Sequence, residues 1–171
     1  MNEKILININ DVLSKNKNII LIPHSSPDAD ALGSCLALYH FFKNENNVNI
    51  ISPNQYTDIL NFLPGSKSVL VFDNEKEKST ILLKNADIIF TLDFNSLSRA
   101  RNLSNLISKS SAKIIMIDHH ENPDKYADIM ISDSKMSSTC EMVYDFICLI
   151  DKNKINNKIA TCLYTGIVAD T

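Results

Sequence analysis

The sequence predicts an α/β fold built around a largely parallel β-sheet with helices on both faces. Short runs of apolar and β-branched residues alternate with longer segments of helical periodicity. The short runs are continuously hydrophobic rather than alternating, as is typical of strands covered on both faces. Histidine and aspartate residues also follow several of these runs, and ligands of such sheets collect outside the carboxyl ends of the strands.

Four apolar runs are predicted to be strands, at residues 19–22, 48–51, 87–92 and 114–117. Segments of helical period are predicted at residues 32–42, 76–84, 98–108, 138–150 and 156–168. This alternation favours a Rossmann-like arrangement, in which helices flank the sheet. No repeat, low-complexity tract or linker divides the chain, so we expect one domain over residues 1–171.

The composition is that of an ordinary globular protein, and it leaves room for a small anionic substrate. The chain is 44% hydrophobic and 22% charged, with a net charge of -3. A negative balance disfavours a basic groove for long duplex nucleic acid, but a small anion can bind where a metal ion supplies positive charge.

The cysteines and the N-terminal segment predict a cytoplasmic location. None of the four cysteines is part of a C-x-x-C pair, which favours buried free thiols in a reducing compartment. Residues 1–10 lack the pattern of an export signal. Since no apolar run approaches the roughly 18 residues of a bilayer span, we expect no membrane partner.

A first polar cluster follows the run at residues 19–22. His24, Asp28 and Asp30 crowd into the turn before the first predicted helix. Asp28 and Asp30 have an alternative interpretation as helix-capping residues, but a helix needs only one N-cap and His24 does not help to form one. The helix N-terminus also favours nearby carboxylates or a bound phosphate.

Three further positions repeat this pattern. Asp93 and the triplet Asp118-His119-His120 each follow a predicted strand, and Asp170 lies at the end of the last apolar segment. Each also has a structural interpretation when taken alone. Asp93 could be a turn or cap residue, the two histidines could lie on a surface loop without a function, and Asp170 could be an isolated carboxylate at a helix end. Together they predict that His and Asp side chains meet at one edge of the sheet.

Charge balance predicts what such a cluster would bind. Without a counter-charge, four converging carboxylates repel one another and some take up protons. Two divalent cations would cancel the four negative charges. Oxygen ligands with an occasional imidazole suit manganese or magnesium better than zinc. A pair of ions about 3.5–4 Å apart can share a hydroxide and hold a phosphoryl group during in-line displacement, so the pattern predicts hydrolysis of a phosphate ester.

The combination of His-x-x-x-Asp-x-Asp with Asp-His-His resembles the DHH phosphoesterase family over nearly the whole chain, with the motifs in the family's order. Supporting stretches are Ala31-Leu32-Gly33-Ser34 and Thr91-Leu92-Asp93-Phe94-Asn95. Within the family the resemblance is greatest to the branch of bifunctional oligoribonucleases and 3'-phosphoadenosine-5'-phosphate phosphatases. It implies manganese-dependent hydrolysis of phosphate esters in short oligoribonucleotides, in 3'-phosphoadenosine 5'-phosphate, or in both.

The resemblance also implies a role for each residue. One ion would be held by His24 and Asp28, with Asp93 bridging to a second ion. The second site would be completed by Asp30, His119 and Asp170.

The remaining implied roles concern the substrate. His120 would face the substrate, and Asp118 would orient an imidazole. Arg99 is interpreted as an exposed helix arginine, and a role in neutralising phosphate is the alternative. Ser138, Thr139 and Glu141 are interpreted as a helix start, which is a structural role: Ser138 is the cap and Glu141 lies three residues later.

The sequence departs from the family in one respect. Members of this branch carry a smaller C-terminal substrate-binding domain, whereas this sequence ends one residue after Asp170, so we expect the catalytic domain alone. A complementing C-terminal domain and a second copy of the chain are both candidate partners, beside a short oligoribonucleotide or nucleotide. A hydrolase similar to family-two inorganic pyrophosphatases, and a truncated non-catalytic metal-binding remnant, stay open as alternatives.

Overall fold

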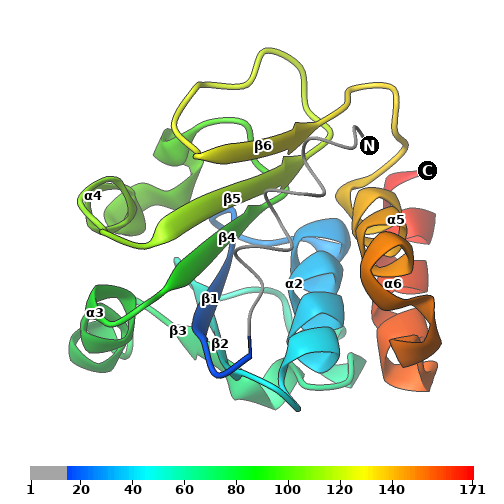
Figure 1. Ribbon diagram of the computed structural model, residues 1–171, viewed down its shortest axis with the longest axis horizontal. Helices are drawn as coiled ribbons and strands as arrows, with labels where there is room; N and C mark the ends of the chain where they lie inside the picture. Colours follow the sequence, from blue (N-terminus) through cyan, green and yellow to red (C-terminus); the bar gives the residue numbers. More distant parts are fainter. Residues whose placement is uncertain (1–14) are drawn as a thin grey trace.

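In the computed structural model, a parallel β-sheet separates two layers of helices (Figure 1). The structure describes residues 15–171, so the segment 1–10, where an export signal was sought, lies outside the described residues. The sheet has six strands in the order β3-β2-β1-β4-β5-β6, and every neighbouring pair is parallel. The predicted α/β, Rossmann-like class is confirmed.

All four predicted strands are present, and two short ones were not predicted. The strands are β1 (Asn18–Pro23), β2 (Asn47–Ser52), β3 (Val69–Val71), β4 (Ile88–Leu92), β5 (Lys113–Asp118) and β6 (Ile129–Ser132). The missed strands, β3 and β6, have three and four residues and lie at the two edges of the sheet. Runs this short carry too little periodicity to distinguish a strand from other structures.

Four of the five predicted helices form within a few residues of their expected ends. The α-helices are α2 (Ala29–Phe42), α3 (Lys76–Lys84), α4 (Ser104–Ser108), α5 (Thr139–Asp151) and α6 (Asn157–Asp170). Short 3-10 helices are η1 (Asp58–Phe62), η2 (Ser66–Ser68), η3 (Leu97–Leu103) and η4 (Lys152–Lys154). The helix predicted at 98–108 is interrupted, because Arg101 has a non-helical backbone with φ 47° and ψ -120°, so η3 and α4 take its place.

Both faces of the sheet are covered, which explains the continuous hydrophobicity of the strands. Ile19 and Leu21 point into a core shared with α2, α5 and α6. Ile20 and Ile22 point into a second core, shared with α3, η3 and α4 on the other face. Figure 1 shows these two groups of helices on opposite sides of the sheet.

Helix α6 lies against α2 and α5 rather than on the sheet. Two glycines permit this close approach. A Cβ atom at Gly33 would lie 2.6 Å from the carbonyl oxygen of Cys162, and one at Gly166 would lie 2.3 Å from Sγ of Cys140. The crossing brings the C-terminal end of α6, with Asp170, toward Asp30 on α2.

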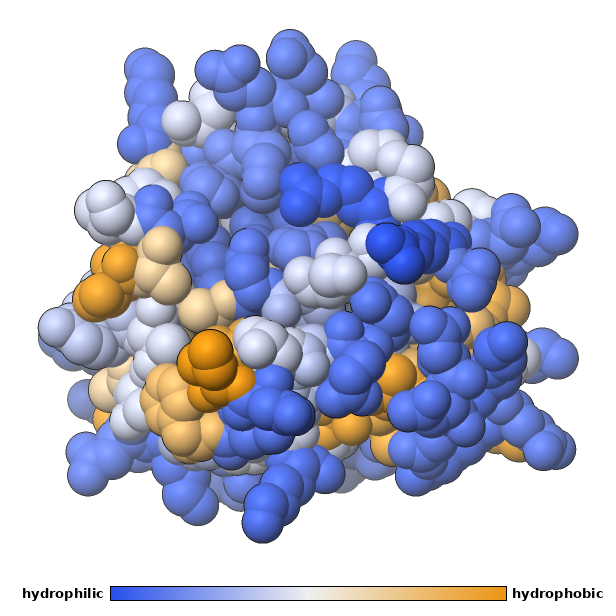
Figure 2. Space-filling model, turned by 180° about the vertical axis from the view of Figure 1, so that it is seen from behind, coloured by the Kyte–Doolittle hydropathy of each residue, from blue (hydrophilic) through white to orange (hydrophobic). Residues whose placement is uncertain are grey.

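Three of the four cysteines are buried free thiols, as the sequence predicted. Cys35, Cys140 and Cys162 are buried free thiols, and Cys148 is a half-buried one. Within residues 15–171, no helix combines the length and the apolar composition of a membrane span. On the rear face, apolar side chains lie in small groups separated by hydrophilic ones (Figure 2).

Candidate metal centre

The candidate site lies where the strand order of the sheet reverses. β1 and β4 are neighbours at the middle of the sheet, although β2 and β3 separate them in sequence. His24 follows β1, Asp93 follows β4, and the Asp118-His119-His120 triplet lies at the end of β5. This is the switch point of a doubly wound sheet, where ligands bind outside the carboxyl ends of the strands.

A first cluster contains His24, Asp28 and Asp93. Nε2 of His24 lies 3.5 Å from Oδ2 of Asp28 and 3.5 Å from Oδ2 of Asp93. Nδ1 of His24 lies 2.8 Å from the carbonyl oxygen of Ser25 and so must carry the hydrogen. Nε2 is therefore directed at the two carboxylates, and it is buried without a hydrogen-bond partner.

A second cluster contains Asp30, His119 and Asp170. Nε2 of His119 lies 3.3 Å from Oδ2 of Asp170 and 4.0 Å from Oδ2 of Asp30. The other ring nitrogen, Nδ1, lies 3.4 Å from the carbonyl oxygen of Met136. Both histidines thus turn Nδ1 toward a backbone carbonyl and Nε2 toward carboxylates, an orientation typical of metal-ligating imidazoles.

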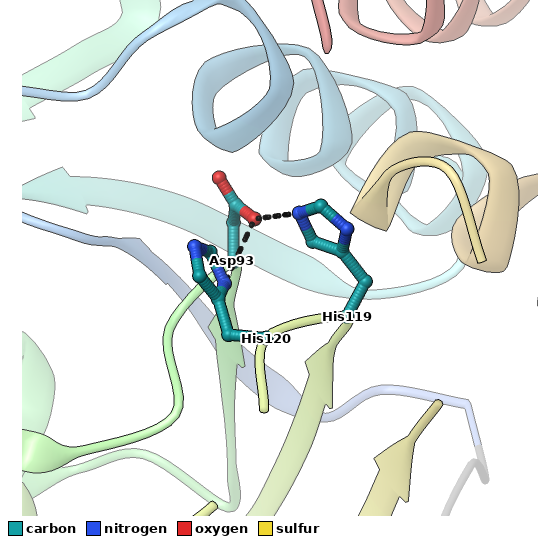
Figure 3. A group of neighbouring side chains, drawn as sticks. All are labelled: Asp93, His119 and His120. Carbon is teal, nitrogen blue, oxygen red and sulfur yellow. Dashed lines mark ion pairs between the residues drawn. The ribbon is translucent and has the colours of Figure 1, made fainter. Parts of the chain in front are cut away.

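Asp93 joins the two clusters through its two different oxygens. Oδ2 faces His24, whereas Oδ1 lies 3.5 Å from Nε2 of His119 and 3.8 Å from Nδ1 of His120. Figure 3 shows one oxygen of Asp93 facing both imidazole rings. Asp93 has a left-handed backbone, with φ 66°, a conformation that aspartate tolerates better than most residues. The bend turns its side chain from the end of β4 into the gap between the clusters.

The donor set and its spacing fit divalent cations. Several nitrogen–oxygen separations are 3.3–3.5 Å, longer than good hydrogen bonds. Two ligand atoms held about 2.1 Å from one ion lie about 3.0–3.6 Å apart, so these separations fit shared coordination. Carboxylate oxygens with one imidazole in each cluster suit manganese or magnesium. The buried Nε2 of His24, which has no partner, is the atom that such an ion would satisfy.

The electrostatics of the first cluster favour a positive charge on His24. Burial opposes protonation, but the facing carboxylates of Asp28 and Asp93, each 3.5 Å from Nε2, outweigh it and raise the pKa of His24 to about 10. The same contact with His24 lowers the pKa of Asp28 to about 2, with help from the backbone N–H groups of Ala31 and Asp30. Asp28 is also the N-cap of α2, so its capping interpretation and its place in the cluster both hold.

In the second cluster the pKa values of two carboxyl groups are raised. Burial, and then repulsion by Asp93, raise the pKa of Asp30 to about 6. Burial also raises the pKa of Asp170, although His119 partly offsets the effect. Both shifts arise mainly from burial, and a bound cation would favour the charged forms of the two carboxyls.

Asp118, His120 and Arg99 form a chain beside the clusters. Nδ1 of His120 lies 2.7 Å from Oδ1 of Asp118, and Nη1 of Arg99 lies 3.2 Å from Nε2 of His120. Because a guanidinium only donates, Nε2 of His120 is the acceptor and Nδ1 carries the proton. Asp118 thus contacts an imidazole as expected, and Arg99 is half-buried in η3 rather than exposed on an α-helix.

The first turn of α5 holds contacts that the sequence did not predict. The helix start is confirmed, since Ser138 is the N-cap and accepts from the N–H of Glu141. In addition, the Thr139 hydroxyl donates to Oδ1 of Asp93 at 2.8 Å. The helix-start pattern did not predict that Thr139 contacts Asp93 and Asp30, which lie 46 and 109 positions earlier in the chain.

A second unpredicted contact secures the loop between His24 and Asp28. Ser26 has a left-handed backbone, with φ 54°. Its N–H donates to Oδ1 of Asn54 at 2.6 Å, and Nδ2 of Asn54 donates to its hydroxyl at 3.0 Å. Asn54 follows β2 and has no sequence signal that would have linked it to the site.

A comparison with protein families identifies the family of this chain. Residues 18–167 match the model described as the DHH family, N-terminal domain. The chain belongs to the DHH family. The DHH-type phosphoesterase class predicted from the sequence agrees with this membership.

Known relatives of this DHH-family chain agree with the branch that it resembles. It is 31% identical over 162 residues to the bifunctional oligoribonuclease and PAP phosphatase NrnA of Bacillus subtilis, covering 93% of this chain and 48% of that protein. The crystal structure of an exopolyphosphatase-related protein from Bacteroides fragilis matches 99% of this chain and 51% of its own, with a TM-score of 0.97 and 38% identity.

A more distant neighbour shows the fold alone. RecJ from Thermus thermophilus, in complex with Mn²⁺, has a TM-score of 0.59 and 14% identity over 98% of this chain and 24% of its own. The chain spans about half the length of the curated NrnA relative that it matches.

Proposed function

We propose that this chain carries the two-metal catalytic centre of a phosphoesterase acting on short oligoribonucleotides, on 3'-phosphoadenosine 5'-phosphate, or on both. The single observation that carries the proposal is the position of Asp93. One oxygen of its carboxylate faces the first cluster and the other faces the second. A carboxylate shared in this way could serve two divalent ions held close together, as in two-metal hydrolytic sites.

Each cluster would hold one ion. His24, Asp28 and Asp93 would bind the first, and the second would be bound by Asp93 with Asp30, His119 and Asp170. When bound, such a pair lowers the pKa of a water molecule and withdraws negative charge from a phosphoryl group. Manganese is the metal we propose, with magnesium as the second choice, because the donors are mainly carboxylate oxygens.

Arg99 and His120 would receive the substrate. Both ring nitrogens of His120 are engaged, one by Asp118 and one by Arg99, which leaves the ring no free nitrogen for a metal. An incoming phosphate is a stronger acceptor for a guanidinium than a neutral imidazole is. Substrate binding would therefore draw Arg99 onto phosphate and free Nε2 of His120. Once Nε2 had taken up a proton from water, the imidazolium would stabilise the phosphate or pass that proton to the leaving oxygen.

The substrate class is supported by two considerations. The Bacillus relative is described as an oligoribonuclease and PAP phosphatase. The chain is acidic, with a net charge of -3, so its attraction for phosphate would have to come from the ions and from Arg99 rather than from a broad basic surface. Both favour short, highly charged nucleotides over long nucleic acid. The proposed partner is thus a small substrate, while a second copy or a complementing domain stays a prediction.

The test is product release with added Mn²⁺. Mononucleotide release from a short oligoribonucleotide and phosphate release from 3'-phosphoadenosine 5'-phosphate are measured for the wild type and for Asp93→Ala. Asp145→Ala is the matched control, since Asp145 is an exposed carboxylate on α5. We expect the wild type and the control to react at the same rate and Asp93→Ala to lose turnover.

The outcomes separate the alternatives. Equal rates for the wild type and Asp93→Ala would exclude Asp93 as a catalytic ligand. Inorganic pyrophosphate in the same panel tests the pyrophosphatase-like alternative, which predicts that it is the preferred substrate. Binding of Mn²⁺ without hydrolysis of any of these compounds would favour the non-catalytic metal-binding alternative.

A further inference from the structure

The first turn of α5 meets the two carboxylates at the heart of the candidate centre. The N–H groups of Thr139 and Cys140 donate to Oδ2 and Oδ1 of Asp30, at 2.6 and 2.8 Å. The Thr139 hydroxyl donates to Oδ1 of Asp93 at 2.8 Å. Thr139, Asp30 and Asp93 are each at most 2% exposed, so water cannot replace these donors.

The two carboxylates depend on α5 in different ways. Asp30 is held by backbone N–H groups, which any residue other than proline supplies at these positions. Asp93 is held by a side chain, because its contact is the hydroxyl of Thr139. The identity of residue 139 therefore matters to Asp93, whereas for Asp30 only the backbone does.

The hydroxyl of Thr139 restrains the plane of the Asp93 carboxylate, so that one oxygen faces each cluster. Rotation about the terminal torsion of an aspartate is otherwise broad and roughly two-fold. The bond from Thr139 retains Oδ1 on the side of α5 and His119, which directs Oδ2 at His24. A fixed carboxylate plane is what allows one group to be shared between two sites.

We propose that Thr139 is a positioning residue for the metal centre, acting through Asp93. This proposal rests on the metal-binding part of the proposed function and adds a residue to which the sequence gave only a helix-start role. The hydroxyl of Thr139 donates to Asp93, so Thr139 acts through this ligand and is not proposed as a ligand itself. It orients the shared ligand, and partners of this kind affect metal affinity by about 10- to 100-fold.

The experiment measures Mn²⁺ binding by isothermal titration calorimetry, without substrate. Thr139→Val replaces the hydroxyl by a methyl group of similar size, and Thr139→Ser restores a hydroxyl. Thr91→Val is the matched control, because Thr91 is a fully buried threonine on β4 whose hydroxyl meets Tyr126 at 2.9 Å and no carboxylate of the centre. Thermal unfolding in EDTA establishes that each variant is folded.

We expect Thr139→Val to weaken Mn²⁺ binding about 10- to 100-fold, with Thr139→Ser and Thr91→Val close to the wild type. If Thr139→Val does not fold, Thr139→Ala is used in its place. This variant also removes the hydroxyl, but it places no methyl group against Asp93. Unchanged affinity in the folded variant without the hydroxyl, or equal weakening in Thr91→Val, would overturn the positioning role while leaving the proposed function intact. Failure of the wild type to bind Mn²⁺ would instead refute the proposed function itself.

Discussion

Gly166 provides a sharp test of how α6 contributes to the second cluster. Replacing it with alanine would place a Cβ atom 2.3 Å from Sγ of Cys140, 2.9 Å from Oδ1 of Asp30 and 3.0 Å from Cα of Asp30. The first distance is far below van der Waals contact, and the third involves backbone, which moves less readily than a flexible side chain. The substitution therefore forces α6 and the Asp30 side chain apart.

The size of the effect follows from two opposing contributions. Overpacking of a dense interior costs about 1–3 kcal/mol. Alanine gains about 1 kcal/mol over glycine inside a helix, and Gly166 lies within α6. We expect a net loss of about 0–2 kcal/mol, which lowers the melting temperature of a chain of this size by at most about 8 °C.

The effect on metal binding should be selective. Displacement of Asp30 opens the cluster of Asp30, His119 and Asp170, whereas the three atoms nearest to the new methyl group belong to Cys140 and Asp30 and not to His24 or Asp28. Titration with Mn²⁺ is therefore expected to show two tight ions in the wild type and one in Gly166→Ala.

Gly33→Ala is the matched control for this experiment. Its Cβ atom would lie 2.6 Å from the carbonyl oxygen of Cys162 and 3.2 Å from Sγ of Cys140, at the same crossing of α2 and α6, and none of its three nearest atoms belongs to a proposed ligand. We expect a comparable loss of stability with both ions retained. Two tight ions in Gly166→Ala, or loss of the same ion in Gly33→Ala, would refute the idea that the Gly166 contact positions Asp30.

Two further predictions concern pH and the loop after β1. The folded pKa of His24, about 10, exceeds its ordinary value of 6.5, and that of Asp30, about 6, exceeds 3.8. In the metal-free protein, stability from His24 is therefore complete below pH 6.5 and is lost toward pH 10, while that from Asp30 is already lost above pH 6. Thermal unfolding in EDTA should show lower stability at pH 9 than at pH 6.5, and Mn²⁺ affinity should rise over the same range as protons are displaced; the opposite trends would contradict the protonated state of His24. Asn54→Ala removes both side-chain contacts with Ser26 and should weaken Mn²⁺ binding about 10-fold. This is the lower end of the range for groups that support metal ligands, because these hydrogen bonds are exposed. An unchanged titration curve would show that the loop keeps its conformation without Asn54.

The elements predicted from the sequence were those with a strong local signal. β1 and β4 are long apolar runs covered on both faces, and their pattern indicates them without tertiary information. β3 and β6 exist because neighbouring strands supply hydrogen bonds to short edge segments. The interruption at Arg101 reflects a local backbone conformation that the helical periodicity of residues 98–108 does not reveal.

The sheet topology made the candidate ligands predictable, but not the residues that hydrogen-bond to them. In a parallel sheet, side chains that follow neighbouring strands meet at one edge, so the positions of His24, Asp93 and His119 in sequence predict their proximity in space. Asp170 joins them only through the crossing of α2 and α6, and the motif resemblance rather than the periodicity pointed to it. Supporting donors such as Thr139 need only a hydroxyl at the right place, which no spacing rule encodes.

The pKa shifts suggest how the centre exists without its ions. Four carboxylates lie within or beside two small clusters, and the protein balances part of that charge by retaining protons, on His24 with a pKa of about 10 and on Asp30 with a pKa of about 6. The separations of 3.3–3.5 Å already match those of shared ligands. Metal binding would then exchange protons for cations in a framework already formed by the sheet edge, α5 and α6. This framework is held by contacts between protein groups. Removing the Thr139 hydroxyl, or adding a methyl group at Gly166, should therefore weaken metal binding without unfolding the chain.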